Sequence, residues 1–223
     1  MALEWMPGRL LGDALEDASF PSARLSAVGA ALAELHLQSP KRFEAGTRER
    51  DTVSLLAVAD ALAVICPNLA ERVTPLAARL ANYLADQALG AHIIHGDFYA
   101  KQVLLQGDQV AMIDLDSARC GHPAADLGNF MAHQESYALS GRVPLQRLDS
   151  DREALLEGYR AGGTQLDLGE IDLYTAIGLL RIAVQPFRNR ESDWLEKIGC
   201  ILERVEAIVQ RSETATLTSG GAI

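Results

Sequence analysis

Apolar residues recur at helical spacing over most of this chain. Within residues 21–39 they lie three or four positions apart, on one helix face, at Leu25, Val28, Leu32 and Leu35. Ser39-Pro40 ends this helix. The same pattern predicts further helices at about 51–65, 68–89, 124–139, 150–162, 168–185 and 193–211. The chain is therefore expected to form a mostly helical domain, with no internal repeat and no linker between domains.

One stretch interrupts the helices, and its pattern is that of short strands. Residues 92–95, 103–106 and 109–113 are apolar runs, each too short for a helix. Gly107-Asp108 separates the last two runs, and Gly at the first position favours a type II′ hairpin turn. Because both faces of this hairpin are apolar, we expect it to be buried, with polar groups at its open end.

The predicted turn also sets the register of the hairpin. If Gln106 pairs with Gln109, the strands bring Gln102 and Asp114 close together in space. Asp97 lies on the loop that enters the hairpin, and Asp116 follows Asp114. Grouped oxygen ligands suit Mg²⁺, and a separate carboxylate can accept a proton from a hydroxyl nucleophile. This division of roles is what phosphoryl transfer from Mg-ATP requires.

Composition and charge narrow the class of protein. With 223 residues, 48% of them hydrophobic, the chain can bury one sizeable core. The formal net charge of −10 argues against nucleic acid or a membrane surface as partner, and is compatible with a cationic small molecule. Cys66, Cys120 and Cys200 form neither a disulfide framework nor a zinc ligand set. With no signal peptide or membrane span expected, the predicted location is cytoplasmic.

Two motifs carry a resemblance to a known family. His95-Gly96-Asp97-Phe98-Tyr99-Ala100-Lys101-Gln102, followed by Ile113-Asp114-Leu115-Asp116, resembles the aminoglycoside phosphotransferase and choline kinase-like family, relatives of protein kinases. Asp126-Leu127-Gly128-Asn129-Phe130 also fits the family's pattern. The resemblance implies that Asp97 is the catalytic carboxylate, that Asp114 is the main Mg²⁺ ligand, that Asp126 supports the catalytic loop, and that His95 fixes its shape.

The resemblance extends more weakly toward the N-terminus. Glu4-Trp5-Met6-Pro7-Gly8 resembles the family's interlobe hinge, which implies that Glu4, Trp5 and Met6 contact the adenine of ATP. Leu32-Ala33-Glu34-Leu35-His36 resembles the first helix of the C-terminal lobe. The fold expected is therefore α+β and mostly α, a protein-kinase-like C-lobe in which a helical bundle holds a small buried β-hairpin. Residues 1–211 would form this lobe, with 1–12 as the hinge-like segment and 212–223 as a flexible tail.

Two features depart from the family's pattern. Gln102 stands where the family's loop normally ends in Asn, and it offers the same amide oxygen on a longer arm. The chain also begins at the hinge-like segment, with no Gly-rich loop, strand Lys or helix Glu before it. The N-terminal lobe that would hold the phosphates of ATP is therefore expected to be absent, which would leave nucleotide held on one face only.

Several alternatives stay open at this point. Asp116 fits a solvated loop acid as well as a second metal ligand, and Trp5 fits a hydrophobic anchor as well as an adenine contact. His36 is expected to be a hydrogen-bonded core residue, and structural or surface roles are expected for His92, His122 and His133. The function is either ATP- and Mg²⁺-dependent phosphorylation of a small hydroxylated molecule, or that of an inactive pseudokinase or scaffold. In a third interpretation, a dimer or a partner chain covers the face of the missing lobe.

Overall fold

The structure of this protein is a computed structural model, which describes residues 7–40, 43, 48–88, 90–164 and 167–219. The described helices are α1 (Leu11–Leu15), α2 (Leu25–His36), α3 (Arg48–Ile65), α4 (Ala70–Asp86), α5 (Ala124–Leu139), α6 (Leu148–Ala161), α7 (Leu168–Ile182), α8 (Gln185–Arg188) and α9 (Trp194–Ser219). The described strands are β1 (Arg9–Leu10), β2 (His92–Ile94), β3 (Val103–Gln106), β4 (Gln109–Met112) and β5 (Arg119–Gly121). The expected mostly helical α+β architecture is thus confirmed.

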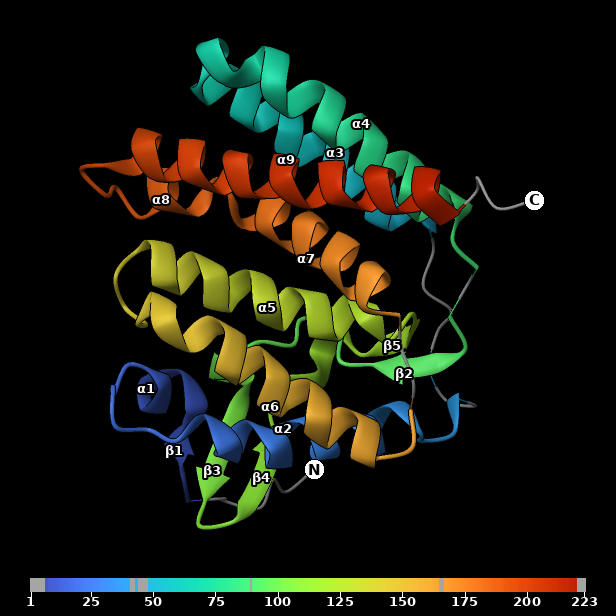
Figure 1. Cartoon of the computed structure of the whole chain (residues 1–223), viewed down its shortest axis with the longest axis vertical. Helices are drawn as coiled ribbons and strands as arrows, with labels where there is room; N and C mark the ends of the chain where they lie inside the picture. Colours follow the sequence, from blue (N-terminus) through green and yellow to red (C-terminus); the bar gives the residue numbers. More distant parts are fainter. Residues whose placement is uncertain (1–6, 41–42, 44–47, 89, 165–166, 220–223) are drawn as a thin grey trace.

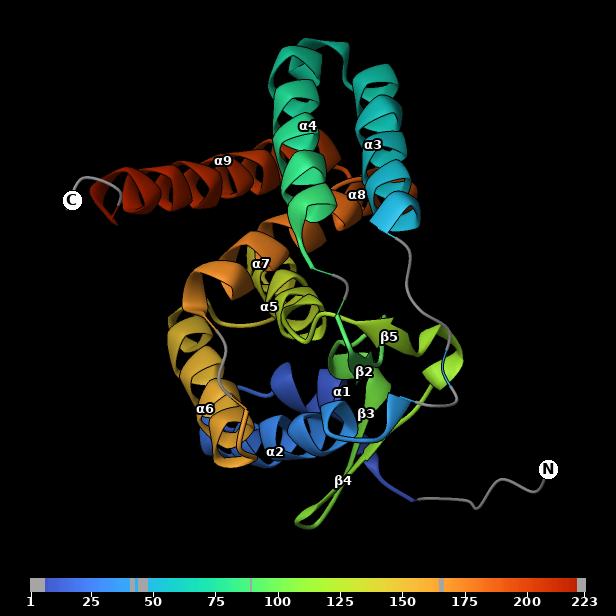
Figure 2. The ribbon, with the colours of Figure 1, turned by 90° about the vertical axis from the view of Figure 1, so that its right-hand side faces the viewer.

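The helices are stacked along the long axis of the molecule (Figures 1 and 2). The α3–α4 hairpin lies at one end, α9, α7 and α5 follow, and the hairpin formed by β3 and β4 lies at the opposite end. No helix in the described part of the chain is long and apolar enough to cross a membrane. In Figure 1 the β2–β5 pair lies beside one end of α5, apart from the β3–β4 hairpin.

Close helix crossings depend on glycine. A side chain on Gly29 of α2 or on Gly158 of α6 would clash with the backbone of the other helix. Gly128 of α5 likewise has no room for a side chain beside Tyr174 of α7. These contacts let α2 pack on α6, and α5 pack on α7, at short range.

The short strands form two antiparallel pairings. Strands β1, β3 and β4 make one sheet, and β2 pairs with β5 in another. The predicted hairpin register is confirmed, because Gln106 lies opposite Gln109 and Val103 lies opposite Met112. Gly107 has a φ of +57°, as the expected hairpin turn requires. Strands β1 and β5 were not predicted, since segments of two or three residues are too short to show alternation.

The expected burial of the hairpin is wrong. Of its strand residues only Val103 is buried, while Leu104, Leu105, Val110, Ala111 and Met112 are half-buried. Leu105, Val110 and Met112 pack against the core, and they lie on one face of the hairpin. Leu104 and Ala111 lie on the other face. The hairpin therefore has one face against the helices and a second face that the described residues cover only in part.

Several expected helix boundaries also differ: α3 begins at Arg48 rather than at 51, and α4 ends at Asp86 rather than at 89. The helix expected over 168–185 ends at Ile182, and a separate short helix with Pro186 in its first turn begins at Gln185. The residues that were expected to fray from Ser212 onward instead continue helix α9 as far as Ser219. The predicted domain limits themselves, 1–211 and 212–223, stay predictions.

Candidate active site

The loop between β2 and β3 carries the predicted catalytic group. Gly96 has a φ of +82°, a conformation that residues with side chains rarely adopt. A side chain at this position would also clash with the carbonyl oxygen of Ser117. The glycine between His95 and Asp97 is thus required both by the backbone turn and by the segment packed against it.

Asp126 binds this loop through its side-chain carboxylate. Its Oδ2 accepts a hydrogen bond from the His95 backbone N–H at 2.6 Å, and its Oδ1 accepts one from the Gly96 N–H at 2.9 Å. Its side chain is 1% exposed, and Oδ2 also lies 3.0 Å from His36 Nε2. The Tyr159 hydroxyl lies 2.7 Å from His36 Nδ1. These contacts connect the loop to α5, and they confirm His36 as a buried, hydrogen-bonded histidine. The supporting role of Asp126 stays a prediction.

His95 connects the loop with the segment that bears Asp114. It is fully buried, and its Nε2 lies 2.9 Å from the carbonyl oxygen of Ile113. Its Nδ1 has no hydrogen-bond partner among the described residues. Since the ring is shielded from solvent, this geometry supports a role in fixing the loop rather than direct contact with a substrate.

Asp97 lies at the surface, directly after Gly96. Burial by the surrounding protein raises the pKa of its carboxyl, although His95 and a hydrogen bond from Asn129 lower it. Asp114 and Asp126 raise the pKa further by charge repulsion. Asn129 Nδ2 also donates to the carbonyl oxygen of Phe98 at 3.1 Å. The carboxyl is thus accessible and more basic than usual, as suits a group that accepts a proton from a hydroxyl.

Gln102 and Asp114 meet at the open end of the hairpin, as predicted. Gln102 is 7% exposed, and its Nε2 donates a hydrogen bond of 3.0 Å to Asp114 Oδ2. Asp114 adopts a left-handed conformation, with φ of 60° and ψ of 55°. Backbone strain of this kind is concentrated at functional sites, where neighbouring contacts maintain it.

The side chains at the open end of the hairpin supply only part of the ligand set that a divalent cation needs. Asp114 and Gln102 supply carboxylate and amide oxygens, which Mg²⁺ prefers, and it usually takes phosphate oxygens and water as well. The described residues contain no group of three His, Cys, Asp or Glu side chains that could hold a metal by themselves. Asp116 is exposed in the short 3₁₀ helix Leu115–Ser117. The predicted adenine contacts Glu4, Trp5 and Met6 lie outside the described residues.

A pocket of about 280 Å³ adjoins the catalytic loop. Tyr99 and Lys101 line it from the loop, and His133 and Tyr137 line it from α5. The rings of Tyr99 and His133 are stacked, with centroids 4.3 Å apart. Burial, together with the charge of Lys101, lowers the pKa of His133 to about 4, so its ring is neutral at pH 7. This pocket was not predicted, because its residues come together only when the loop, α5 and the segment 182–191 pack against one another.

Asn129 was also missed as a site residue. It lies three positions after Asp126 on α5, so both side chains are on one helix face, beneath the catalytic loop. That spacing was the available signal.

The three cysteines are free, as expected.

Comparisons with known proteins bear on the family and the fold of this chain. A family model described as "Phosphotransferase enzyme family" matches residues 1–171. No curated protein sequence matches this chain significantly. Among solved structures, an amicoumacin kinase in complex with AMP-PNP, Ca²⁺ and Ami is 14% identical, with a TM-score of 0.63 over 92% of this chain and 63% of its own.

Two further structures are similar at the level of the fold. A glucosamine kinase in complex with glucosamine, ADP and inorganic phosphate is 17% identical, with a TM-score of 0.62, over 88% of this chain and 56% of its own. A thermostable mutant of aminoglycoside phosphotransferase APH(4)-Ia is 17% identical, with a TM-score of 0.61, over 97% of this chain and 71% of its own. The chain therefore spans little more than half to about 70% of the length of these proteins.

Proposed function

The chain belongs to the phosphotransferase enzyme family, and we propose that it carries the catalytic part of an ATP- and Mg²⁺-dependent enzyme that phosphorylates a hydroxyl of a small molecule. The observation that supports this most strongly is the position of Asp97. It is exposed on a loop whose backbone donates two hydrogen bonds to Asp126. Such a loop holds a carboxylate in place to orient a hydroxyl and accept its proton.

The proposed metal group is Asp114 with Gln102, and Asp116 is kept as a second candidate. Mg-ATP, when bound, would supply the phosphoryl group and neutralise its charge. The hydrogen bond from Gln102 orients the Asp114 carboxylate, and the Asp114 backbone is in the left-handed conformation. Glu4, Trp5 and Met6 remain the proposed adenine contacts.

The proposed acceptor pocket is the one lined by Tyr99, Lys101, His133 and Tyr137. The stacked, neutral Tyr99 and His133 rings suit the apolar face of a sugar-like ring. The net charge of −10 favours a cationic acceptor, but two of the lining groups, Lys101 and Arg142, are cations. The lining acid Glu191 is already paired with Lys197 at 2.7 Å. A neutral or acidic polyol is therefore the favoured acceptor.

We also propose that the described helices and hairpin correspond to the C-terminal lobe of a protein-kinase-like fold, cytoplasmic in location. The short span relative to the solved structures and the half-exposed face of the β3–β4 hairpin are consistent with this. An inactive remnant, or a dimer or partner that covers this face, would share the same fold. Measuring phosphoryl transfer by the chain distinguishes an active enzyme from an inactive remnant.

The experiment is a transfer assay with the purified chain, Mg-ATP and four acceptors. These are a neutral sugar, a sugar acid, an amino sugar and a quaternary amino alcohol, with phosphomonoester formation followed by ³¹P NMR. We expect transfer to at least one acceptor, and a loss of roughly 10²–10⁴-fold in Asp97→Asn. Since the pKa of Asp97 is raised, the rate should rise with pH through that pKa. Nucleotide binding without transfer to any acceptor would favour the remnant.

A further inference from the structure

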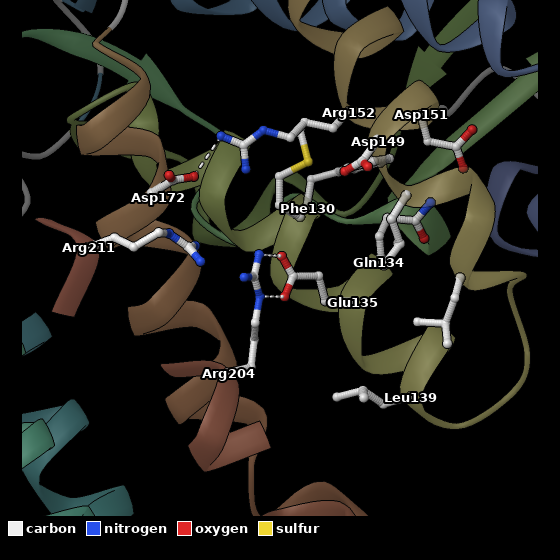
Figure 3. Close-up of a pocket in the computed structure, with 13 residues that line it drawn as sticks. Phe130, Gln134, Glu135, Leu139, Asp149, Asp151, Arg152, Asp172, Arg204 and Arg211 are labelled. Atoms are coloured by element: carbon white, nitrogen blue, oxygen red, sulfur yellow. Dashed lines mark hydrogen bonds and ion pairs between the residues drawn. The ribbon is translucent and has the colours of Figure 1, made fainter. Parts of the chain in front are cut away.

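A second cavity, of about 340 Å³, lies between α5, α6, α7 and α9 (Figure 3). We call it the α5–α9 cavity. Its lining is largely apolar and includes Phe130, Met131, Leu139, Leu145 and Leu148. A volume of this size is at the lower end of the range for small-molecule sites, which combine apolar walls with a few polar groups.

Two polar side chains in this lining are buried and incompletely paired. Gln134 is 3% exposed, and neither its Nε2 nor its Oε1 has a partner among the described residues. Asp151 is 2% exposed; its Oδ1 accepts a hydrogen bond of 3.1 Å from Arg147, whereas Oδ2 has no described partner. Buried polar atoms are nearly always hydrogen-bonded, because leaving them unpaired is costly. Three such atoms belong to residues that line one cavity, and a fourth, Nε of Arg147, belongs to the side chain that binds Asp151. Unpaired polar atoms beside an apolar cavity favour a ligand with a polar head.

The remaining charges of the lining are mostly paired. Arg204 binds Glu135 through two hydrogen bonds of 2.6 and 2.8 Å, and Arg152 binds Asp172 at 2.6 Å. Figure 3 shows both pairs, with Gln134 and Asp151 lying apart from them toward α6. The unpaired atoms of the lining are two acceptors, Gln134 Oε1 and Asp151 Oδ2, and one donor, Gln134 Nε2. They match a head group rich in N–H donors and disfavour an anion beside Asp151.

The cavity is separate from the proposed acceptor pocket. Helix α5 contributes Met131 and Gln134 to the α5–α9 cavity, and His133 and Tyr137 to the pocket at the catalytic loop. At 3.6 residues per turn these two sets project from different faces of the helix. A molecule in one site would therefore not occupy the other.

We propose that the α5–α9 cavity is a second small-molecule site, which takes an apolar body bearing a planar amide or amidine head hydrogen-bonded to Gln134 and Asp151. This site goes beyond the phosphotransferase function and does not depend on it. Binding to it is measurable in the chain as it exists, whether or not phosphoryl transfer occurs.

The test uses three molecules of the same shape, namely benzamide, benzamidine and benzoate. Each is titrated into the full chain while backbone amide signals are followed by NMR. Benzamide and benzamidine should bind, and benzoate should bind at least tenfold more weakly, because its carboxylate faces Asp151. Gln134→Leu keeps the side-chain size and should weaken benzamide about tenfold, since it removes the paired donor and acceptor. Gln106→Leu, an exposed glutamine at the end of β3, is the matched control and should change nothing.

A second variant protects the test against misfolding of the first. Leu145 lines the cavity and is 59% exposed, so Leu145→Trp should narrow the opening without disturbing the core, and should also weaken benzamide. Equal binding of benzoate, or benzamide binding unchanged in both variants, would overturn the proposal. So would the absence of binding by all three molecules at millimolar concentration, which would leave a cavity that holds water only.

Discussion

Gln102 Nε2 donates a hydrogen bond of 3.0 Å to Asp114 Oδ2, which joins the end of the catalytic loop to the proposed metal ligand. Gln102 is buried, whereas Asp114 is exposed in a left-handed conformation. The amide nitrogen faces the carboxylate, so the amide group would have to turn over for its oxygen to join Asp114 at a cation.

This relationship predicts the effect of Gln102→Met. The variant keeps a long unbranched side chain but has neither the N–H donor nor the amide oxygen. We expect Mg²⁺-dependent nucleotide binding to weaken by roughly 10–100-fold, the usual consequence of removing a group that orients a metal ligand. The free energy of unfolding should fall by only about 1 kcal/mol. Calorimetric titration and urea unfolding measure the two effects. Unchanged Mg²⁺ dependence would remove Gln102 from the site.

Asp126 should be a major determinant of stability. Its buried carboxylate accepts two backbone hydrogen bonds from the catalytic loop and contacts His36. Asp126→Asn places an amide N–H against donors, and we expect it to lower the free energy of unfolding by about 3 kcal/mol. Asp116→Asn is the matched control, because Asp116 is exposed, and it should stay within about 0.5 kcal/mol of the parent. Urea unfolding that ranks the two variants equally would contradict this account.

Gly96 and Gly107 offer a paired test of the catalytic loop. Both have positive φ, but a side chain would clash with Ser117 at Gly96 and would meet nothing within 4 Å at Gly107. Gly107→Ala should therefore cost only the backbone strain, about 1 kcal/mol. Gly96→Ala should cost at least about 3 kcal/mol, because strain and overlap add. Thermal or urea unfolding compares the two. Equal losses would mean that the segment at Ser117 does not confine the loop.

His133 predicts a pH dependence of stability. Its pKa is lowered to about 4 in the folded protein, so the unfolded chain binds the proton more tightly. The contribution to stability is complete above pH 6.5 and is lost as the pH falls from 6.5 to about 4, by at most about 3 kcal/mol. In His133→Phe, which keeps a ring beside Tyr99, this part of the acid dependence should disappear. Parallel pH profiles of unfolding for the two proteins would refute the assignment.

The helices and the hairpin could be predicted because each follows a local pattern. The register of β3 and β4 followed from the Gly107-Asp108 turn, and it brought Gln102 beside Asp114. The contact of Asp126 with the backbone of His95 could not be derived from spacing, since 31 positions separate the two residues. It came from the resemblance. Likewise, only the packing of the loop on α5 stacks Tyr99 on His133.

The burial of the hairpin shows why the remainder could not be predicted. Apolar residues on both faces indicated two covered faces, but the pattern does not say what covers them. The α5–α9 cavity has a similar origin, because Gln134 and Asp151 lie on different helices and neither belongs to a motif. Sites that arise from helix packing leave no periodic signal in one sequence.

The most direct test of the central claim is a calorimetric titration of ATP into the chain, with and without Mg²⁺, beside Asp114→Asn and Asp97→Asn. The account predicts Mg²⁺-dependent binding that Asp114→Asn loses and Asp97→Asn retains, since Asp114 is proposed to hold the cation and Asp97 to act on the acceptor. Binding that is independent of Mg²⁺, or that Asp114→Asn leaves unchanged, would contradict it. No binding at millimolar ATP would mean that this chain does not hold nucleotide by itself.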